Sequence, residues 1–239
     1  MSTSQEIRRR KAAVFIDAEN HDDLSVSTLM NTLDRYDVVE QHAYADWRTR
    51  RLARLAWQLK RFGFEMHHAF SGRSPGAEKD EADGCMARGI TRVLGLRHDV
   101  AVVVIVTGDA FFTQVVHQLQ RSGKRVTVVA NPFRTSRELY AVADEYFPIG
   151  RWGRALSDLD QLERDHRYLT FSFVTGHSKI GSSVLGEMIR QNLVIQQNVH
   201  RPERGIRPEL RLNRKAPIVE MVLDVGRGRS TSSSLLQAA

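Results

Sequence analysis

The stretch Val100–Phe112, VAVVVIVTGDAFF, decides the fold of this 239-residue chain. The apolar residues at 101–106 follow one another without the alternation of a half-exposed strand, which indicates a strand buried on both faces at the centre of a parallel sheet. Gly108 allows a sharp turn, and Asp109 then lies at the carboxyl end of the strand, where open α/β sheets bind their ligands. Apolar residues at helical spacing follow from Phe112. The stretch therefore predicts a strand, an acidic turn and a helix.

The same alternation of strand and helix extends over residues 11–150. We predict strands near 12–17, 38–46, 64–70, 101–106, 125–130 and 145–149, and helices near 25–36, 47–61, 78–96 and 136–143 and from 112 onward. Right-handed crossovers join strands that alternate with helices in this way. The expected fold is α/β, with a mostly parallel sheet covered by helices on both faces.

Three acids from distant parts of the chain are predicted to meet at one edge of this sheet. Asp17 and Asp109 follow two strands, and Asp83 lies early in the helix after the third strand, on the same helix face as Asp80. Clustered carboxylates raise one another's pKa unless a cation neutralises them, so the group predicts a divalent metal site. Carboxylate ligands suit Mg²⁺ or Mn²⁺, which activate water for phosphodiester hydrolysis. Asn20, three residues after Asp17, is expected to orient a ligand or a water.

A structural role is the alternative for these acids. Asp109 precedes a helix, where a carboxylate caps backbone N–H groups, and Asp17 can do the same. Capping is the more common role for either residue alone. The occurrence of three such acids at one edge favours the metal site.

Four motifs resemble those of the NYN domain family, the LabA-like relatives of PIN nucleases. They are FIDAEN at 15–20, YADW at 44–47, EKDEAD at 78–83 and VTGDAFF at 106–112, in the family's order. The resemblance implies a three-layer, PIN-like domain at residues 11–150 and a metal-dependent endoribonuclease, with Asp17, Asp83 and Asp109 as its acids. Two further acids that are usual in the family are absent, because Phe111 and Gly89 stand at their positions.

These two departures leave several hypotheses about activity open. The chain cleaves RNA with one or two metal ions, alone or with a partner that supplies a group. Otherwise it is a catalytically silent nucleic-acid-binding or adaptor protein. A DNA-directed nuclease is a third hypothesis, because the sequence identifies neither a contact to the 2′-hydroxyl nor a base-stacking surface. Single-stranded RNA is the favoured substrate.

Positive charge is expected to contact phosphates. Residues 1–150 carry 21 Lys and Arg against 19 Asp and Glu, and residues 151–239 carry 14 against 9. This balance fits a polyanionic partner such as RNA, and residues 1–10 form a basic arm. A solvated helix face is the alternative for the four arginines at 48–54. The predicted nucleic-acid contacts are Arg48, Arg50, Arg51, Arg54, Lys79, Arg204 and Arg207.

A second domain is predicted at residues 151–225. Helical segments precede an alternating hairpin near 193–212 with the loop PERGIRP, and an apolar segment follows at 218–225. Helices followed by a basic hairpin are typical of a winged helix, and bacterial members of the family often carry a winged-helix or LOTUS-like module here. Such a wing grips nucleic acid or docks a protein, and the sequence separates neither these roles nor a monomer from a homo-oligomer. Residues 226–239 are expected to be a disordered tail.

The cellular environment is predicted from what the sequence lacks. No apolar run has membrane-spanning length, and residues 1–11 do not resemble a secretory signal. The lone Cys85 excludes a disulfide within the chain, so we expect a cytoplasmic protein. His67 and His68 end the third predicted strand, and packing or solvation is a more common role for such histidines than metal binding.

Overall fold

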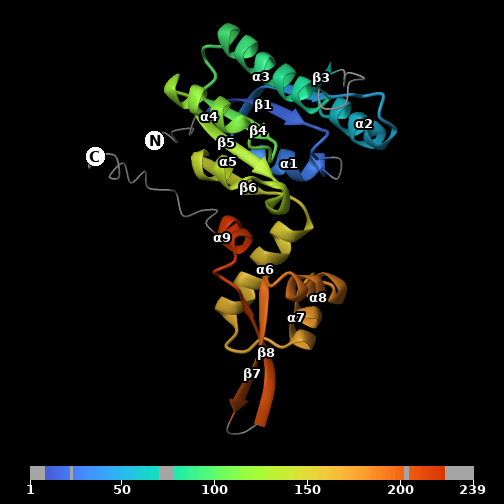
Figure 1. Ribbon diagram of the computed structural model, residues 1–239, viewed down its shortest axis with the longest axis vertical. Coiled ribbons are helices and arrows are strands. Elements are labelled where there is room, and N and C mark those ends of the chain that lie inside the picture. Colours follow the sequence, from blue (N-terminus) through green and yellow to red (C-terminus); the bar gives the residue numbers. More distant parts are fainter. Residues whose placement is uncertain (1–8, 22–23, 70–77, 202–204, 224–239) are drawn as a thin grey trace, which may run out of the picture. The chain divides into compact units, whose positions relative to one another are not determined.

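The computed structural model describes residues 9–21, 24–69, 78–201 and 205–223 (Figure 1). The chain divides into two compact units, Met1–Phe147 and Pro148–Ala239. Most of the predicted basic arm at 1–10 and the whole of the predicted tail at 226–239 lie outside the described residues.

A six-stranded sheet forms the centre of the first unit, in the order β3-β2-β1-β4-β5-β6. The strand pairs from β3 to β5 are parallel. The predicted α/β fold with a parallel sheet is therefore confirmed, and β1 and β4 are neighbours at its centre. The strands are β1 (Lys11–Asp17), β2 (Asp37–Ala45), β3 (Glu65–His68), β4 (Val102–Val106), β5 (Arg125–Ala130) and β6 (Glu145–Pro148).

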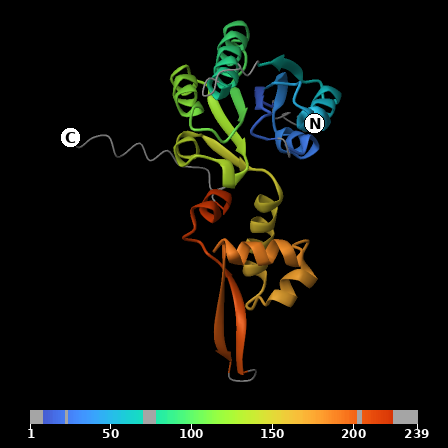
Figure 2. The same cartoon turned by 45° about the vertical axis from the view of Figure 1, so that its right-hand side comes forward.

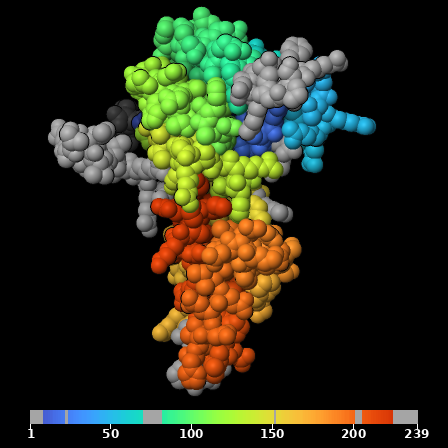
Figure 3. Space-filling view, viewed as in Figure 1, coloured from blue at the N-terminus to red at the C-terminus, as the bar shows by residue number. Residues whose placement is uncertain are grey.

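Helices cover both faces of this sheet. They are α1 (Val26–Leu33), α2 (Ala53–Arg61), α3 (Glu78–Leu96), α4 (Phe112–Arg121) and α5 (Arg137–Val142). α1 contacts α2, whereas α3, α4 and α5 contact one another in series. With right-handed crossovers the two sets lie on opposite faces, and α3 and α4 are side by side at the surface (Figures 1 and 3). This cover explains why every residue of β4 is buried.

The chain after β2 differs from the prediction. A helix was expected at 47–61, but a 3₁₀ helix, η1 (Arg50–Leu52), precedes α2, and residues 47–49 form a turn. The Asp46 carboxylate accepts the backbone N–H of Arg48 at 3.1 Å, and the Asp46 carbonyl accepts that of Thr49 at 3.0 Å. These bonds replace the first helical turn, because an aspartate side chain competes with the helix for backbone donors.

Gly108 is required for a different reason from the one predicted. A Cβ atom at this position would lie 2.1 Å from the carbonyl oxygen of Arg134, in the 3₁₀ helix η2 (Pro132–Arg134) after β5. The N–H of Ser136 also donates to the Gly108 carbonyl at 2.8 Å. Gly108 is not among the glycines with a positive φ. The glycine thus gives room for the loop after β5, and no sharp turn requires it.

The second unit has its own apolar core. Its elements are α6 (Arg151–Asp165), α7 (Phe171–His177), α8 (Ser182–Arg190), β7 (Val194–Arg201), β8 (Gly205–Leu212) and α9 (Pro217–Leu223). Leu156, Leu185 and Met188 are fully buried in that core. β7 and β8 form the predicted antiparallel hairpin, which extends beyond the helices of its own unit (Figure 2). Among the described residues, no helix has the length and apolar character needed to cross a membrane.

Candidate functional site

Asp17 is a buried carboxylate at the end of β1. Its Oδ2 accepts a hydrogen bond from the Thr107 hydroxyl at 3.0 Å and another from the side-chain amide of Asn20. Its Oδ1 accepts the backbone N–H of Asn20 at 3.3 Å. Burial raises the pKa of Asp17 above its ordinary value of 3.8, although these three hydrogen bonds oppose the shift. Asn20 therefore orients the carboxylate itself.

The surroundings of Asp17 fit a divalent cation. All three donors to its carboxylate are neutral, and the charged side chain that shifts its pKa is another acid, Glu19. No ion pair of Asp17 occurs in the part of the chain that the structure describes. A buried charge without a counter-charge is costly, and an ion such as Mg²⁺ or Mn²⁺ would supply one.

Thr107 connects Asp17 to Asp109. Its hydroxyl donates to Asp17 and accepts the backbone N–H of Asp109 at 3.3 Å. Sequence reasoning gave Thr107 no role. The feature of the sequence that could have identified Thr107 is a polar residue directly after the apolar run of β4. The structure shows that Thr107 is completely buried.

Asp109 takes up part of its alternative structural role. Its Oδ1 accepts the N–H of Phe111 at 3.0 Å, in the turn that leads into α4. The carboxylate is partly exposed, so it remains accessible from solvent. Capping of this turn and binding of an ion are compatible, because a carboxylate has two oxygens.

Asp83 is buried on α3, which packs against β1 and β2. α3 faces the side of the sheet that Tyr44 occupies, and Tyr44 pairs in register with Asp17, so Asp83 and Asp17 belong to the same face. The carboxylates of Asp17, Asp83 and Asp109 do not form a group with ligand atoms within 4.8 Å of one another. Asp80 and Lys79 also belong to α3, but their side chains lie outside the described residues.

The two missing acids have different physical consequences. A Cβ atom on Gly89 would lie 2.0 Å from the Tyr44 hydroxyl, so the tyrosine fills the space that an acidic side chain would need. Burial raises the pKa of Tyr44 to about 12, so this hydroxyl stays protonated. Phe111, in contrast, is 42% exposed and packs edge-to-face on Phe112.

Basic side chains lie near the carboxyl ends of the strands. The Arg48 guanidinium donates one hydrogen bond to each carboxylate oxygen of Asp46, at 2.9 and 2.7 Å. Arg50 and Arg51 of η1 and Arg54 of α2 are exposed. Sequence reasoning missed Arg134, an exposed residue of η2 that donates to the Asn20 carbonyl at 3.2 Å. Its signal in the sequence was its position in the loop that follows the fifth predicted strand.

Two of the predicted nucleic-acid contacts, Arg204 and Arg207, belong to the second unit. Arg207 is exposed on β8, opposite Val199 of β7. Arg204 lies outside the described residues. The neighbouring Arg214 pairs with Asp160 and Glu163, each at 2.7 Å, and thus connects the end of the hairpin to α6.

Comparison with known proteins places the first unit in a family. The sequence profile of the NYN domain matches residues 11–150. The crystal structure of a protein of unknown function from Vibrio parahaemolyticus is similar to this chain in fold, with a TM-score of 0.51 and 24% sequence identity. The match covers 62% of this chain and 97% of that one. UDP-GlcNAc 2-epimerase from Neisseria meningitidis is 11% identical with a TM-score of 0.39, covering 79% of this chain and 55% of that one. No curated protein matches the chain.

Proposed function

The chain belongs to the NYN domain family, and on this premise we propose that it is a metal-dependent endoribonuclease acting on single-stranded RNA. The observation that carries the proposal is the buried Asp17 carboxylate, which has only neutral hydrogen-bond donors in the described structure. A bound Mg²⁺ or Mn²⁺ would supply the missing positive charge. It would also lower the pKa of a bound water and stabilise the phosphate oxygens.

The residues of this chain have separate roles in the proposal. Asp17, Asp83 and Asp109 hold the ion, with Asp80 as a helper. Asn20 and Thr107 fix the position of the Asp17 carboxylate, and their hydrogen bonds favour its charged form. Catalysis then depends on how well these neutral donors keep the carboxylate in place, as is usual for the supporting groups of metal ligands.

RNA would approach along the carboxyl ends of the strands. The arginines at 48–54 and Arg134 are exposed there and supply positive charge for phosphates. The exposed ring of Phe111, next to Asp109, offers a surface on which a base stacks. In the second unit, we propose a winged-helix-like module in which Arg207 contacts the RNA backbone or the hairpin docks a protein.

The second candidate function is binding without cleavage, as an adaptor. It is favoured by the two positions where usual acids are replaced, one by the exposed Phe111 and the other by a glycine whose space Tyr44 fills. With these acids missing, the residues that remain would hold one ion in place of two, and the site would then lose stabilisation of either the attacking or the leaving oxygen.

Cleavage of labelled single-stranded RNA and DNA by the purified protein tests these alternatives. The reactions contain Mn²⁺, Mg²⁺ or a chelator, with the Asp17→Asn/Asp109→Asn double variant alongside. Asp99→Asn is the matched control, because Asp99 lies before β4 and pairs with Lys11 and Arg97. We expect metal-dependent RNA cleavage by the wild type and the control, and none by the double variant.

The other outcomes separate the hypotheses. If the wild type and the double variant are equally inert but both bind RNA in chelator, the protein is a binder. Cleavage of DNA in preference to RNA would support a DNA-directed nuclease.

A further inference from the structure

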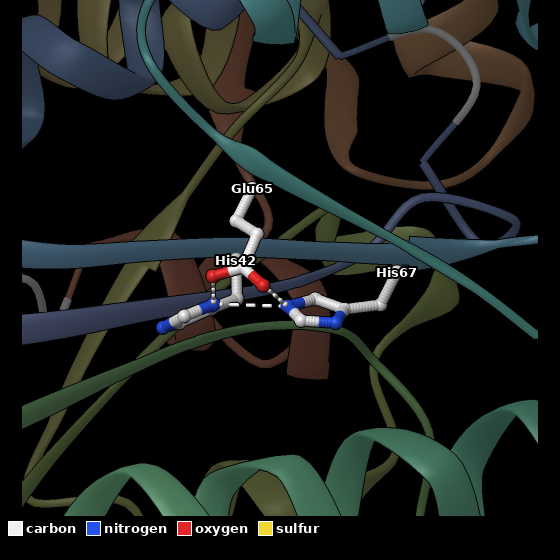
Figure 4. Close-up of side chains that lie close together, drawn as sticks. All are labelled: His42, Glu65 and His67. Carbon is white, nitrogen blue, oxygen red and sulfur yellow. Dashed lines mark hydrogen bonds and ion pairs between the residues drawn. The ribbon is translucent and has the colours of Figure 1, made fainter.

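A group of three side chains of the types that bind metal ions lies on β2 and β3. His42, Glu65 and His67 each present one ligand atom, and these atoms lie within 4.8 Å of one another. His42 Nδ1 is 3.0 Å from His67 Nε2, and the two oxygens of Glu65 lie 3.4 Å from the first nitrogen and 3.6 Å from the second. Figure 4 shows the two ring nitrogens pointing at each other beneath the Glu65 carboxylate.

Hydrogen bonding alone does not account for this arrangement. The two rings share one N···N contact of hydrogen-bond length, but the Glu65 oxygens are too far from either nitrogen for good hydrogen bonds. In a tetrahedral site with metal–ligand bonds of about 2.0–2.1 Å, neighbouring ligand atoms lie about 3.3 Å apart. The N···N separation of 3.0 Å is close to that value, and each ring nitrogen has a Glu65 oxygen at 3.4 or 3.6 Å.

The rings are held in place before any ion binds. His42 is buried and stacks on Phe15 with ring centroids 5.3 Å apart, and His67 stacks on Tyr44 at 4.5 Å. Burial is the main cause that lowers the pKa of His67, which favours the neutral ring. A neutral imidazole is the form that binds metal ions.

The far side of His42 has the partner that a metal-bound histidine commonly has. Its Nε2 is buried without a hydrogen bond, and Glu40 Oε2 lies 3.2 Å away, close enough for an ion pair. A carboxylate on the second nitrogen orients a ligating ring and increases its basicity. The other oxygen of the Glu40 carboxylate forms an ion pair with Arg97, which holds the carboxylate in place beside His42.

We propose that His42 Nδ1, His67 Nε2 and the Glu65 carboxylate bind a Zn²⁺ ion that joins the edge strand β3 to β2. Two imidazoles and a carboxylate are ligands that Zn²⁺ prefers, whereas Mg²⁺ prefers oxygen ligands alone. The site is therefore chemically distinct from the acids of the proposed nuclease centre. The Glu65 side chain is 62% exposed, so an ion can enter from solvent and keep a water as its fourth ligand.

Metal titration of the full-length protein, stripped of ions with a chelator, tests the site. Zn²⁺ binding is measured by competition with a chromophoric chelator. Co²⁺ serves as a spectroscopic probe, because its visible absorption reports four-coordinate nitrogen and oxygen ligation. We expect one Zn²⁺ per chain in the wild type, and affinities at least roughly 10-fold weaker in His67→Gln and Glu65→Gln.

Two controls make the result specific, and Glu65→Gln provides a second test variant. His98→Gln removes an exposed histidine outside the cluster and should bind Zn²⁺ like the wild type. The Asp17→Asn/Asp109→Asn double variant should also keep the Zn²⁺ site, so failure of the nuclease proposal would leave the Zn²⁺ proposal unaffected. Glu65→Gln changes an exposed side chain and keeps the test valid if His67→Gln fails to fold.

Two results would overturn the proposal. The first is a wild-type protein that binds no Zn²⁺ at this stoichiometry and gives no four-coordinate Co²⁺ spectrum. The second is a folded Glu65→Gln variant that binds Zn²⁺ as tightly as the wild type, because other residues would then be the ligands.

Discussion

At the scale of single residues, Thr107 determines how the Asp17 carboxylate is presented. Thr107→Val keeps the shape of the side chain but removes the hydroxyl that donates to Asp17 and accepts the backbone N–H of Asp109. We expect a loss of stability of about 1 kcal/mol and Mn²⁺ binding weaker by roughly 10–100-fold. Thermal unfolding with and without Mn²⁺ measures both effects.

A matched substitution exists in the neighbouring strand. Thr127 is also completely buried, but its hydroxyl contacts Tyr36 Oη at 3.2 Å rather than Asp17 or Asp109. Thr127→Val should lose similar stability and keep the Mn²⁺ response. Equal Mn²⁺ responses in the two valine variants would rule out a special role for Thr107.

The raised pKa of Asp17 gives a pH dependence with a definite sign. Folding favours the protonated form, so this group's contribution to stability is complete below the ordinary value of 3.8 and is lost as pH rises through the folded value. A cation replaces the proton, so the Mn²⁺-induced rise in Tm should increase as the pH is raised above 3.8. Melting curves in Mn²⁺ and in chelator above this pH provide the measurement, and a rise that does not change with pH would contradict it.

At the scale of elements, the close contact between the end of β4 and the loop after β5 requires a glycine. Gly108→Ala would place a methyl group 2.1 Å from the Arg134 carbonyl oxygen. We expect a loss of about 1–3 kcal/mol, because backbone atoms have to move. Denaturant unfolding measures this loss.

The control for Gly108→Ala is a glycine-to-alanine substitution that should increase stability. Gly95 lies in the last turn of α3 with open space around its Cα, so Gly95→Ala should stabilise the chain by roughly 0.5–1 kcal/mol. If both alanine variants changed stability equally, the close approach at Gly108 would not be the cause.

Periodicity predicted most elements of the first unit because their apolar residues pack between the sheet and the helices on its two faces. The bounds of α3 and β5 agree with the prediction, whereas the turn after β2 does not, because the Asp46 side chain takes the backbone donors of a first helical turn. Periodicity counts apolar positions and contains no information about such a side-chain bond.

The His42, Glu65 and His67 cluster was not predictable in the same way. It depends on the register that pairs His42 with Glu65 and Tyr44 with His67 across β2 and β3. A shift of one residue would turn His67 to the opposite face of the sheet. The placement of Asp17 and Asp109 does not depend on this register, because any parallel sheet brings its strand ends to one edge, and their role in a metal site stays a prediction.

At the scale of the whole molecule, the two units have separate cores, and we expect the first to fold alone. A fragment of residues 1–150 should unfold cooperatively and keep metal-dependent RNA cleavage. It should bind RNA more weakly than the full chain and with a smaller dependence on salt, because the contacts of the second unit are lost. Circular dichroism and binding measured at two salt concentrations test this, and an unfolded fragment would contradict it.

The sheet order also determines when the molecule can become functional during synthesis. Residues 12–16 of β1 each pair with a residue of β4 that is 90 positions later in the chain, as Ala12 does with Val102. A ribosome adding about 5–20 residues per second needs roughly 5–20 seconds to cover that distance. Throughout this time the apolar β1 lacks its central neighbour and Asp17 lacks Thr107. If the proposed nuclease function holds, a nascent chain would be unable to cleave RNA close to the ribosome until it has grown past Asp109.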